Sequence, residues 1–189
     1  NSPEIYDGDI TRNVDWKIKS FEFDNMFCYG KGNKIDFTKL DGTVGVVAPN
    51  HSGKSAIMDA IAYTIYDVCS RTTKALDVMN KKKTTFRAKL NLEINGMDYW
   101  IERDAQYKRV NHKNGKVSHN CPVKVKFYMI DEAGEEVDLS GAARFNSQYG
   151  GGTNEEIKKV LGTFDDFILT SLSLQTNGMN FLDKKQSER

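Results

Sequence analysis

The chain has 189 residues, 39% of them hydrophobic and 28% charged, and a formal net charge of +1. This length suits one domain, or one large lobe of a larger protein, with a core that needs no disulfide or metal to hold it together. The near-neutral charge excludes a protein that binds polyanions by bulk charge, so any contact with nucleic acid requires a local basic patch.

The cysteines and the hydropathy indicate the setting in which the chain works. Cys28, Cys69 and Cys121 are odd in number and widely spaced, a usage typical of a reducing, intracellular compartment. No apolar run approaches the roughly 18 residues of a membrane-spanning helix, and the polar N-terminus does not resemble a signal peptide. We therefore expect a cytoplasmic or nucleoid-associated protein that does not enter a membrane.

The first part of the chain is typical of a leader followed by strands. Residues 1–13 are polar and without periodicity, which indicates a leader or a seam left by excision from a longer protein. Alternation of apolar and polar residues over Trp16–Phe23 and Asn33–Phe37 predicts two half-buried strands that pair with each other. The continuous β-branched run Thr43–Ala48 predicts a strand buried on both faces.

An amphipathic helix and an antiparallel region follow. Ser55–Val68 has the spacing of a helix, and a crossover loop comes after it. Alternation over residues 86–95, 97–104 and 123–130 predicts three more strands, and Asn95–Gly96 is typical of a tight hairpin turn between the first two. No helix separates these strands, so we expect them to be antiparallel. The apolar stripe of the helix consists of Ile57, Ala60, Ile61, Ile65 and Val68.

The C-terminal part is predicted to be largely helical. Residues 148–154 indicate a flexible break, followed by a helix over residues 153–162 with Thr153 or Asn154 as its N-cap and a glycine stop. Residues 164–177 are expected to form a helix that runs into a short strand. The last segment is polar, helix-compatible and without a terminating glycine, so we expect the natural chain to continue.

The segment between the predicted buried strand and the first helix has the composition of a phosphate-binding loop. It reads VVAPNHSGKS, with Ala48 where the pattern G-x-x-x-x-G-K-[ST] has its first glycine. Backbone N–H groups of Asn50–Lys54 can wrap a β-phosphate, and the start of the helix directs its positive dipole end at the anion. Lys54 would bridge the β- and γ-phosphates, and the Ser55 hydroxyl would bind Mg²⁺.

The longer stretch VVAPNHSGKSAIMDAIAYTIY resembles the G-x-N-G-x-G-K-S-x-x-x-D-A-I pattern of the SbcC/SMC group of ABC-type ATPases, DNA double-strand-break repair and recombination proteins with coiled-coil arms. DNMFCYGKGNKIDF resembles the family's first hairpin, and SLSLQTNGMNFLDKKQSER resembles its Q-loop and the start of its coiled coil. The resemblance implies an α/β P-loop NTPase of the ABC-ATPase head type, a mixed β-sheet with an antiparallel β subdomain. It implies the N-terminal lobe only, over residues 14–180, with a coiled-coil helix beginning at residues 181–189.

The resemblance also implies roles for individual residues. Gln175 would be the Q-loop glutamine, which acts in catalysis with Lys54 and binds Mg²⁺ or orients the attacking water. Arg71 falls where the family often has a basic residue near the nucleotide, while Asp59 is expected to be mainly structural. The nucleotide-binding residues implied in this way are Asn50, His51, Ser52, Gly53, Lys54, Ser55, Ala56 and Arg71.

Three positions depart from the family pattern. Ala48 and His51 replace glycines, and Phe27 stands where many members carry an arginine that contacts the nucleotide. Alanine costs about 1–2 kcal/mol wherever a backbone requires the left-handed conformation. These departures lower the nucleotide affinity expected of the isolated lobe.

The resemblance implies a function and partners as well. The lobe would bind ATP and Mg²⁺, and would hydrolyse ATP once its C-terminal half is present and two heads dimerise around the nucleotide. The implied partners are that C-terminal half, a second head, DNA, and a nuclease subunit acting on DNA ends. One alternative is an SMC-type ATPase that entraps DNA and organises chromosomes. Another is a stand-alone P-loop NTPase or kinase.

The stand-alone alternative would use Asp131 and Glu132, which follow an apolar strand as a catalytic acidic motif does, while residues 138–144 mimic a signature loop. In the family, however, the signature precedes the acidic motif, so the order here is reversed. A strand beside the phosphate loop should also be parallel and reached by a helical crossover. We therefore expect Asp131 and Glu132 to lie in a solvated turn.

Two remaining groups of residues are ambiguous. Lys81–Lys83 and the stretch Arg103–Lys126 are locally basic. Such runs usually form a solvated face, and the functional alternative is contact with DNA phosphates. His112, His119 and Cys121 have no spacing typical of a metal site, so we expect none there.

Overall fold

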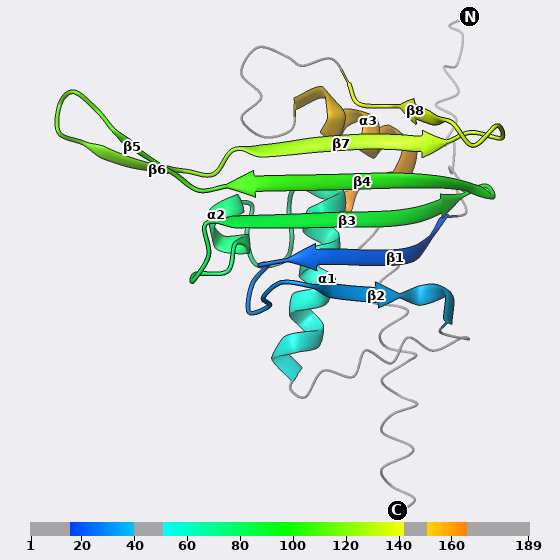
Figure 1. Ribbon diagram of the computed structural model, residues 1–189, viewed down its shortest axis with the longest axis horizontal. Coiled ribbons are helices and arrows are strands. Elements are labelled where there is room, and N and C mark those ends of the chain that lie inside the picture. Colours follow the sequence, from blue (N-terminus) through cyan, green and yellow to red (C-terminus); the bar gives the residue numbers. More distant parts are fainter. Residues whose placement is uncertain (1–15, 40–50, 142–150, 166–189) are drawn as a thin grey trace, which may run out of the picture.

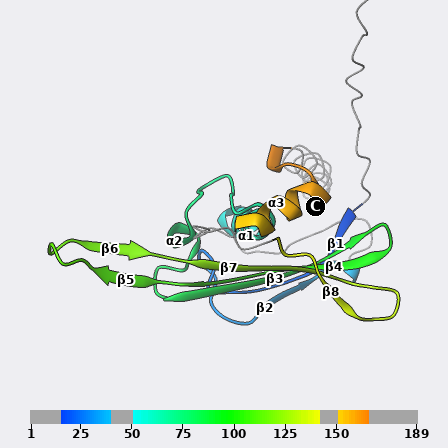
Figure 2. The same ribbon diagram turned by 90° about the horizontal axis from the view of Figure 1, so that it is seen from above.

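The computed structural model describes residues 16–39, 51–141 and 151–165, with only the backbone of residues 39, 51–55 and 151. Its main feature is a six-stranded antiparallel sheet in the order β2-β1-β3-β4-β7-β8, with the helices on one face (Figure 1, Figure 2). The strands are β1 (Trp16–Asp24), β2 (Asn33–Asp36), β3 (Thr85–Ile94), β4 (Met97–Gln106), β7 (Val123–Ile130) and β8 (Glu136–Asp138). A two-stranded sheet of β5 (Lys108–Asn111) and β6 (Val117–Asn120) projects from one end. The helices are α1 (His51–Tyr66), α2 (Ala75–Val78) and α3 (Gly151–Leu161), with a 3-10 turn η1 (Phe37–Lys39).

The inner face of the sheet is a continuous apolar layer. Phe21, Leu90, Ile101 and Phe127 lie opposite one another on four adjacent strands, and each is 0% exposed. Because side chains alternate between the faces of a strand, this register directs every second residue around these four positions toward the core. The period-two pattern of the sequence is therefore what fixes the pairing.

The strand predictions are confirmed where the structure describes them. β1 pairs with β2, β3 pairs with β4, and β4 pairs with β7, all antiparallel. The tight turn at Asn95–Gly96 is also confirmed, with φ values of 51° and 79° that suit a type I′ hairpin. The predicted strand Thr43–Ala48 lies outside the described residues, as do residues 1–13 and 181–189.

Helix α1 is buried all round from Ala56 onward, apart from half-buried Met58. The predicted apolar stripe is confirmed for its four positions within the helix, and Val68 follows the helix and is half-buried. A single stripe was nevertheless too narrow a prediction, because Ala62, Tyr63 and Thr64 on the other sides are also buried. The predicted bounds were also shifted, since the helix begins at His51 and ends at Tyr66.

The C-terminal end of α1 is held by an arginine from the sheet. Arg103 on β4 donates from Nε to the Thr64 carbonyl at 2.6 Å and from an Nη to the Ile65 carbonyl at 3.3 Å. Its other contacts are to Asn154 Oδ1 on α3 at 2.8 Å and to Asp67 Oδ1 at 3.5 Å. Asp67 has a φ of 60°, the left-handed conformation that commonly ends a helix.

Arg103 is 0% exposed, so the prediction that it belongs to a basic surface was wrong. The last carbonyls of a helix lack intrahelical partners, and those of α1 lie in the interior, where water cannot satisfy them. Burial lowers the pKa of the Arg103 guanidinium, an effect that the Asp67 carboxylate opposes. Burial likewise raises the pKa of Asp67, opposed by the Arg103 charge. The buried pair thus joins α1, β4 and α3.

The connections differ from the predictions in several places. The crossover loop contains the short helix α2, and β5, β6 and β8 were not predicted. α3 begins at Gly151 rather than at a Thr153 or Asn154 cap, so part of the expected flexible break is helical. The predicted glycine stop is confirmed at Gly162, whose φ is 84°. Gly141 approaches the start of α3 so closely that a Cβ there would lie 2.5 Å from the Gly152 backbone.

Replacing Arg103 with methionine should strongly destabilise the fold. It leaves the Asp67 carboxylate without its cationic partner and two helix carbonyls without their donor, a loss of about 3 to 5 kcal/mol for a broken buried pair. The measurement is equilibrium urea denaturation of the chain, with Arg87→Met on the exposed face of β3 as the matched control, expected within about 0.5 kcal/mol of wild type. Equal effects of the two substitutions would contradict the role assigned to Arg103.

Candidate nucleotide-binding site at the start of helix α1

The start of α1 is suited to an anion. Because the helix begins at His51, the residues Gly53, Lys54 and Ser55 lie in its first turns, and no acidic residue is present in the first turn. The first four N–H groups of a helix have no intrahelical acceptor, and the positive end of the dipole lies there. No carboxylate of the first turn competes for these groups, so the helix start fits a phosphate.

The individual roles of the loop residues remain predictions. Asn50 and Gln175 lie outside the described residues, and the side chains of residues 51–55 are not described. Ala56 is 1% exposed, and the backbone contact with phosphate that the resemblance implies for it stays a prediction. The structure therefore describes the helix start at His51, while the phosphate-binding loop before it stays a prediction from the motif.

Asp59 ties the segment after α1 back against the helix. Its Oδ1 accepts hydrogen bonds from the Ser70 hydroxyl at 2.6 Å and the Ser70 N–H at 3.3 Å, and Oδ2 pairs with Arg71 Nε at 2.7 Å. Asp59 is 5% exposed, and these contacts agree with the structural role expected of it. Since residues four apart are neighbours on a helix, Asp59 lies one turn from Ser55. Asp59 thus holds Arg71 against α1, and the contact of Arg71 with a nucleotide stays a prediction.

Phe27, in the connection between β1 and β2, also contacts Arg71. The Arg71 guanidinium carbon lies 5.7 Å from the Phe27 ring centroid, within the range of a cation–π contact. Phe27 has a φ of 51°, and its N–H donates to the Val78 carbonyl at 2.6 Å. A bulky residue in this conformation is strained, and such strain is concentrated at functional sites. The cluster of Ser70, Arg71 and Phe27 was not predicted as a unit, because an irregular turn assembles it.

The acidic motif in the sequence is a hairpin turn, as expected. Asp131 Oδ1 accepts hydrogen bonds from the N–H groups of Ala133 and Glu135, each at 2.9 Å, and Glu132 is exposed. The preceding strand, β7, is antiparallel to both of its neighbours. Ser140 of the signature-like segment accepts from the Phe127 N–H at 3.1 Å. These residues therefore serve the β7–β8 hairpin.

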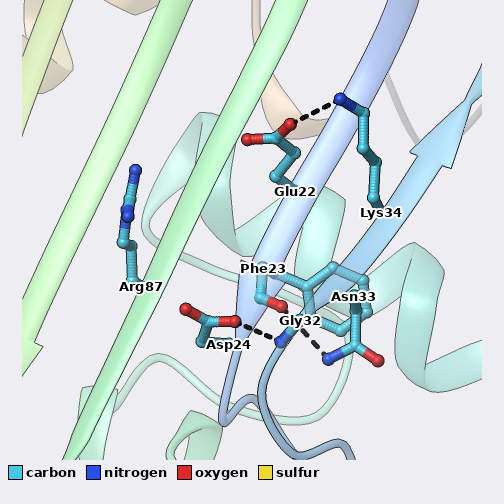
Figure 3. Close-up of a pocket in the computed structure, with 7 residues that line it drawn as sticks. All are labelled: Glu22, Phe23, Asp24, Gly32, Asn33, Lys34 and Arg87. Atoms are coloured by element: carbon cyan, nitrogen blue, oxygen red, sulfur yellow. Dashed lines mark hydrogen bonds and ion pairs between the residues drawn. The ribbon is translucent and has the colours of Figure 1, made fainter.

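An open depression lies on the outer face of the sheet, away from α1 (Figure 3). Its charged groups are largely occupied with one another: Lys34 pairs with Glu22 at 2.9 Å, and Asp24 accepts from the Gly32 N–H at 2.6 Å. Lys34, Glu22 and Asp24 are thus engaged within the protein, and the predicted nucleotide site at the start of α1 is on the other side of the sheet. The lining residues are Glu22, Phe23, Asp24, Gly32, Asn33, Lys34 and Arg87.

The two histidines and the cysteine near β5 and β6 are engaged otherwise than as metal ligands. His112 Nε2 lies 2.9 Å from Ser118 Oγ, and His119 Nδ1 lies 2.6 Å from the Tyr107 hydroxyl. Burial raises the pKa of the Cys121 thiol to about 11. Over the described residues, no three His, Cys, Asp or Glu side chains gather in a way that could hold a metal.

Over the same residues, no helix is long and apolar enough to cross a membrane.

Fold and site together define a class of protein. A helix with an acid-free, Gly-Lys-Ser-bearing first turn packs on an antiparallel sheet, as expected for the N-terminal lobe of a P-loop NTPase of the ABC-ATPase head type. The chain matches the AAA domain family over residues 20–189, and it therefore belongs to that family. The resemblance to the head of an SbcC/SMC-type ATPase, predicted from the sequence, is confirmed.

Two curated relatives are similar to this chain over most of its length. Uncharacterized protein R555 of Acanthamoeba polyphaga mimivirus is 34% identical over 183 residues, which are 95% of this chain and 13% of that protein. The SbcC subunit of the nuclease SbcCD from Clostridium acetobutylicum is 27% identical over 164 residues, which are 82% of this chain and 13% of that protein. The chain thus spans about an eighth of the length of the relatives it matches.

Two solved structures of the recombination mediator protein RecF are similar to part of this chain. The structure with ATP has a TM-score of 0.43 at 18% identity, covering 57% of this chain and 28% of that one. The structure named RecF-ATPrS has a TM-score of 0.40 at 19% identity, covering 56% of this chain and 26% of that one.

Alkylation of Cys121 should be slow at pH 8 and should accelerate about tenfold per pH unit up to pH 10. Only the thiolate reacts, and with a pKa of about 11 its fraction rises in proportion to hydroxide over that range. Peptide mapping after timed iodoacetamide treatment measures each cysteine separately, with the urea-denatured chain as the control for full reactivity. A Cys121 rate that levels off by pH 9 would contradict the raised pKa.

Proposed function

We propose that this chain is the ATP-binding lobe of the head of a DNA repair or recombination ATPase, which acts on DNA ends with a partner nuclease. The observation that carries the proposal is α1, whose acid-free first turn bears Gly53, Lys54 and Ser55 and beside which Asp59 holds Arg71. A cationic side chain, free N–H groups and a helix dipole converging on one place are what a triphosphate requires.

Within this proposal each residue has a defined part. The backbone of residues 50–53 and of Ala56 surrounds the β-phosphate, and Lys54 neutralises the β- and γ-phosphates. Ser55 and Gln175 hold Mg²⁺, which screens the phosphate charge when bound. Arg71 supplies, next to the ring of Phe27, the positive charge that many relatives carry at position 27.

The rest of the machinery lies elsewhere in a longer protein. The relatives extend far beyond the matched region, and the described residues supply neither a catalytic acid nor a free signature serine, since Asp131 and Ser140 stabilise a hairpin. We propose that residues 14–180 form the lobe and 181–189 begin a coiled coil that leads to the C-terminal half. ATP then joins two such heads, and the assembly works in the cytoplasm on DNA.

The similarity to a nuclease subunit favours this role over chromosome organisation by an SMC-type ATPase. The stand-alone NTPase is disfavoured because its proposed base, Glu132, is an exposed turn residue on an antiparallel hairpin.

Lys54→Ala should abolish ATP binding. The lysine is the one side chain of the loop with a full positive charge, and a lost charge-assisted contact costs about 1.5–3 kcal/mol or more per hydrogen bond. Fluorescent-ATP titration measures the affinity, and Lys17→Ala is the matched control, since Lys17 pairs with Glu93 across the sheet. Turnover should appear only when the C-terminal half is added. Unchanged affinity in Lys54→Ala would refute the site.

A further inference from the structure

The β5–β6 hairpin is a separate two-stranded sheet that does not pair with the six-stranded sheet. Residues 107–122, here named the basic arm, extend beyond the six-stranded sheet in both views (Figure 1, Figure 2). All four residues of β5 are exposed, as are three of the four in β6. The arm therefore contributes little to the core, and its length and shape call for another explanation.

The arm carries uncompensated positive charge. From residue 105 to residue 130 the sequence has no Asp or Glu, in a chain whose net charge is only +1. Within the part of the chain that the structure describes, none of the four arm cations has an ion-pair partner. Like charges crowded together repel one another, so a bound polyanion would be stabilised here. The four cations are Lys108, Arg109, Lys113 and Lys116.

The outer face of the main sheet shows what an ordinary solvated face looks like in this molecule. There, Lys17 pairs with Glu93 at 3.1 Å, Lys34 with Glu22 at 2.9 Å, and Lys89 with Glu102 at 3.1 Å. Cross-strand acids neutralise the lysines of the sheet, whereas the arm has no acids at all. The difference argues against reading the arm as one more solvated face.

A second basic group adjoins the root of the arm. The Tyr107 N–H donates to the Thr84 carbonyl at 2.8 Å, which places the turn Lys81–Lys83 beside the point where the arm leaves the sheet. These three lysines are exposed, and the turn is held by a hydrogen bond from Lys83 N–H to the Asn80 carbonyl at 2.8 Å. Turn and arm thus form one basic surface at one end of the sheet.

The arm has the shape and the stiffness to meet a nucleic acid. A two-stranded ribbon fits the major groove of duplex DNA, which is about 12 Å wide. At the root, the rings of Tyr107 and His119 stack with centroids 5.8 Å apart and are joined by a hydrogen bond of 2.6 Å. Such a contact limits bending of the ribbon, so less ordering cost remains on binding.

We propose that the basic arm and Lys81–Lys83 together form a surface that binds duplex DNA through its phosphate backbone. The choice of DNA rests on the proposed function, while the uncompensated charge is a property of the arm itself. Lysines and arginines on phosphates position a protein without reading sequence, so the surface holds the duplex independently of its sequence.

The test is DNA binding by the full-length protein with all four arm cations changed to glutamine: Lys108→Gln, Arg109→Gln, Lys113→Gln and Lys116→Gln. Affinity for a blunt 30-base-pair duplex is measured without nucleotide over a series of salt concentrations, about 50 to 200 mM. Four lost phosphate contacts should reduce the slope of log affinity against log salt by up to about 3.6. At about 100 mM salt the affinity should fall more than tenfold.

The matched control removes the same charge from the outer face of the sheet. It changes four ion-paired lysines to glutamine, and we expect affinity and salt slope close to those of wild type. Equal losses in both variants would mean bulk attraction only and would overturn the proposal. An arm variant that binds DNA like wild type would overturn it too and leave an acidic protein as the partner. The control lysines are Lys17, Lys19, Lys34 and Lys89.

Folding and nucleotide binding are checked separately. Because the arm is exposed, its variant should keep the wild-type unfolding transition and the wild-type ATP affinity. A second variant, in which residues 110–117 are replaced by Asn-Gly, removes the tip of the arm with two of its four cations, and should weaken DNA binding and lower the salt slope about half as much. Failure of wild-type protein to bind ATP would refute the proposed function alone, since the DNA measurement is made without nucleotide.

Discussion

The placement of helix α1 depends on one buried guanidinium. α1 has no acid in its first turn and no base in its last turn, so its own sequence leaves both ends of the dipole uncompensated. Arg103 from β4 supplies the missing cation at the C-terminal end and satisfies the Thr64 and Ile65 carbonyls. The predicted phosphate site is at the opposite end, where the first turn of the helix has no acidic residue. The buried guanidinium therefore anchors α1 at the end remote from that predicted site.

Much of the fold was predictable because hydrophobic periodicity dominates it. The alternation in β3 and β4, with Asn95–Gly96 between them, fixed the hairpin and its register. The same alternation could have revealed Arg103, since it occupies an inward position between Ile101 and Ala105, both buried. Arg103 was instead grouped with the surrounding surface charges, and its inward position was overlooked. An arginine in phase with core residues signals a buried partner, although the sequence does not say which one.

The arm and the Asp59 cluster show where sequence reasoning stops. A second Asn-Gly pair, Asn114–Gly115, marks the tip of the arm with Gly115 at a φ of 78°, and it could have predicted the hairpin. The contact of Asp59 with Ser70 and Arg71 could not be read in the same way. It depends on an irregular turn after α1, which no periodicity encodes. The phosphate-binding loop, in contrast, is a prediction from its motif alone.

The close approach of Gly141 to Gly152 has a consequence for how this lobe tolerates length variation. Gly141 follows the last strand of the sheet and Gly152 lies at the start of α3, so the two ends of the intervening segment are held at neighbouring positions. Closing a longer loop costs only about 0.6 kcal/mol for each doubling of its length. An affinity tag or a small reporter domain inserted between Gly141 and Gly152 should therefore be tolerated, provided both glycines are kept.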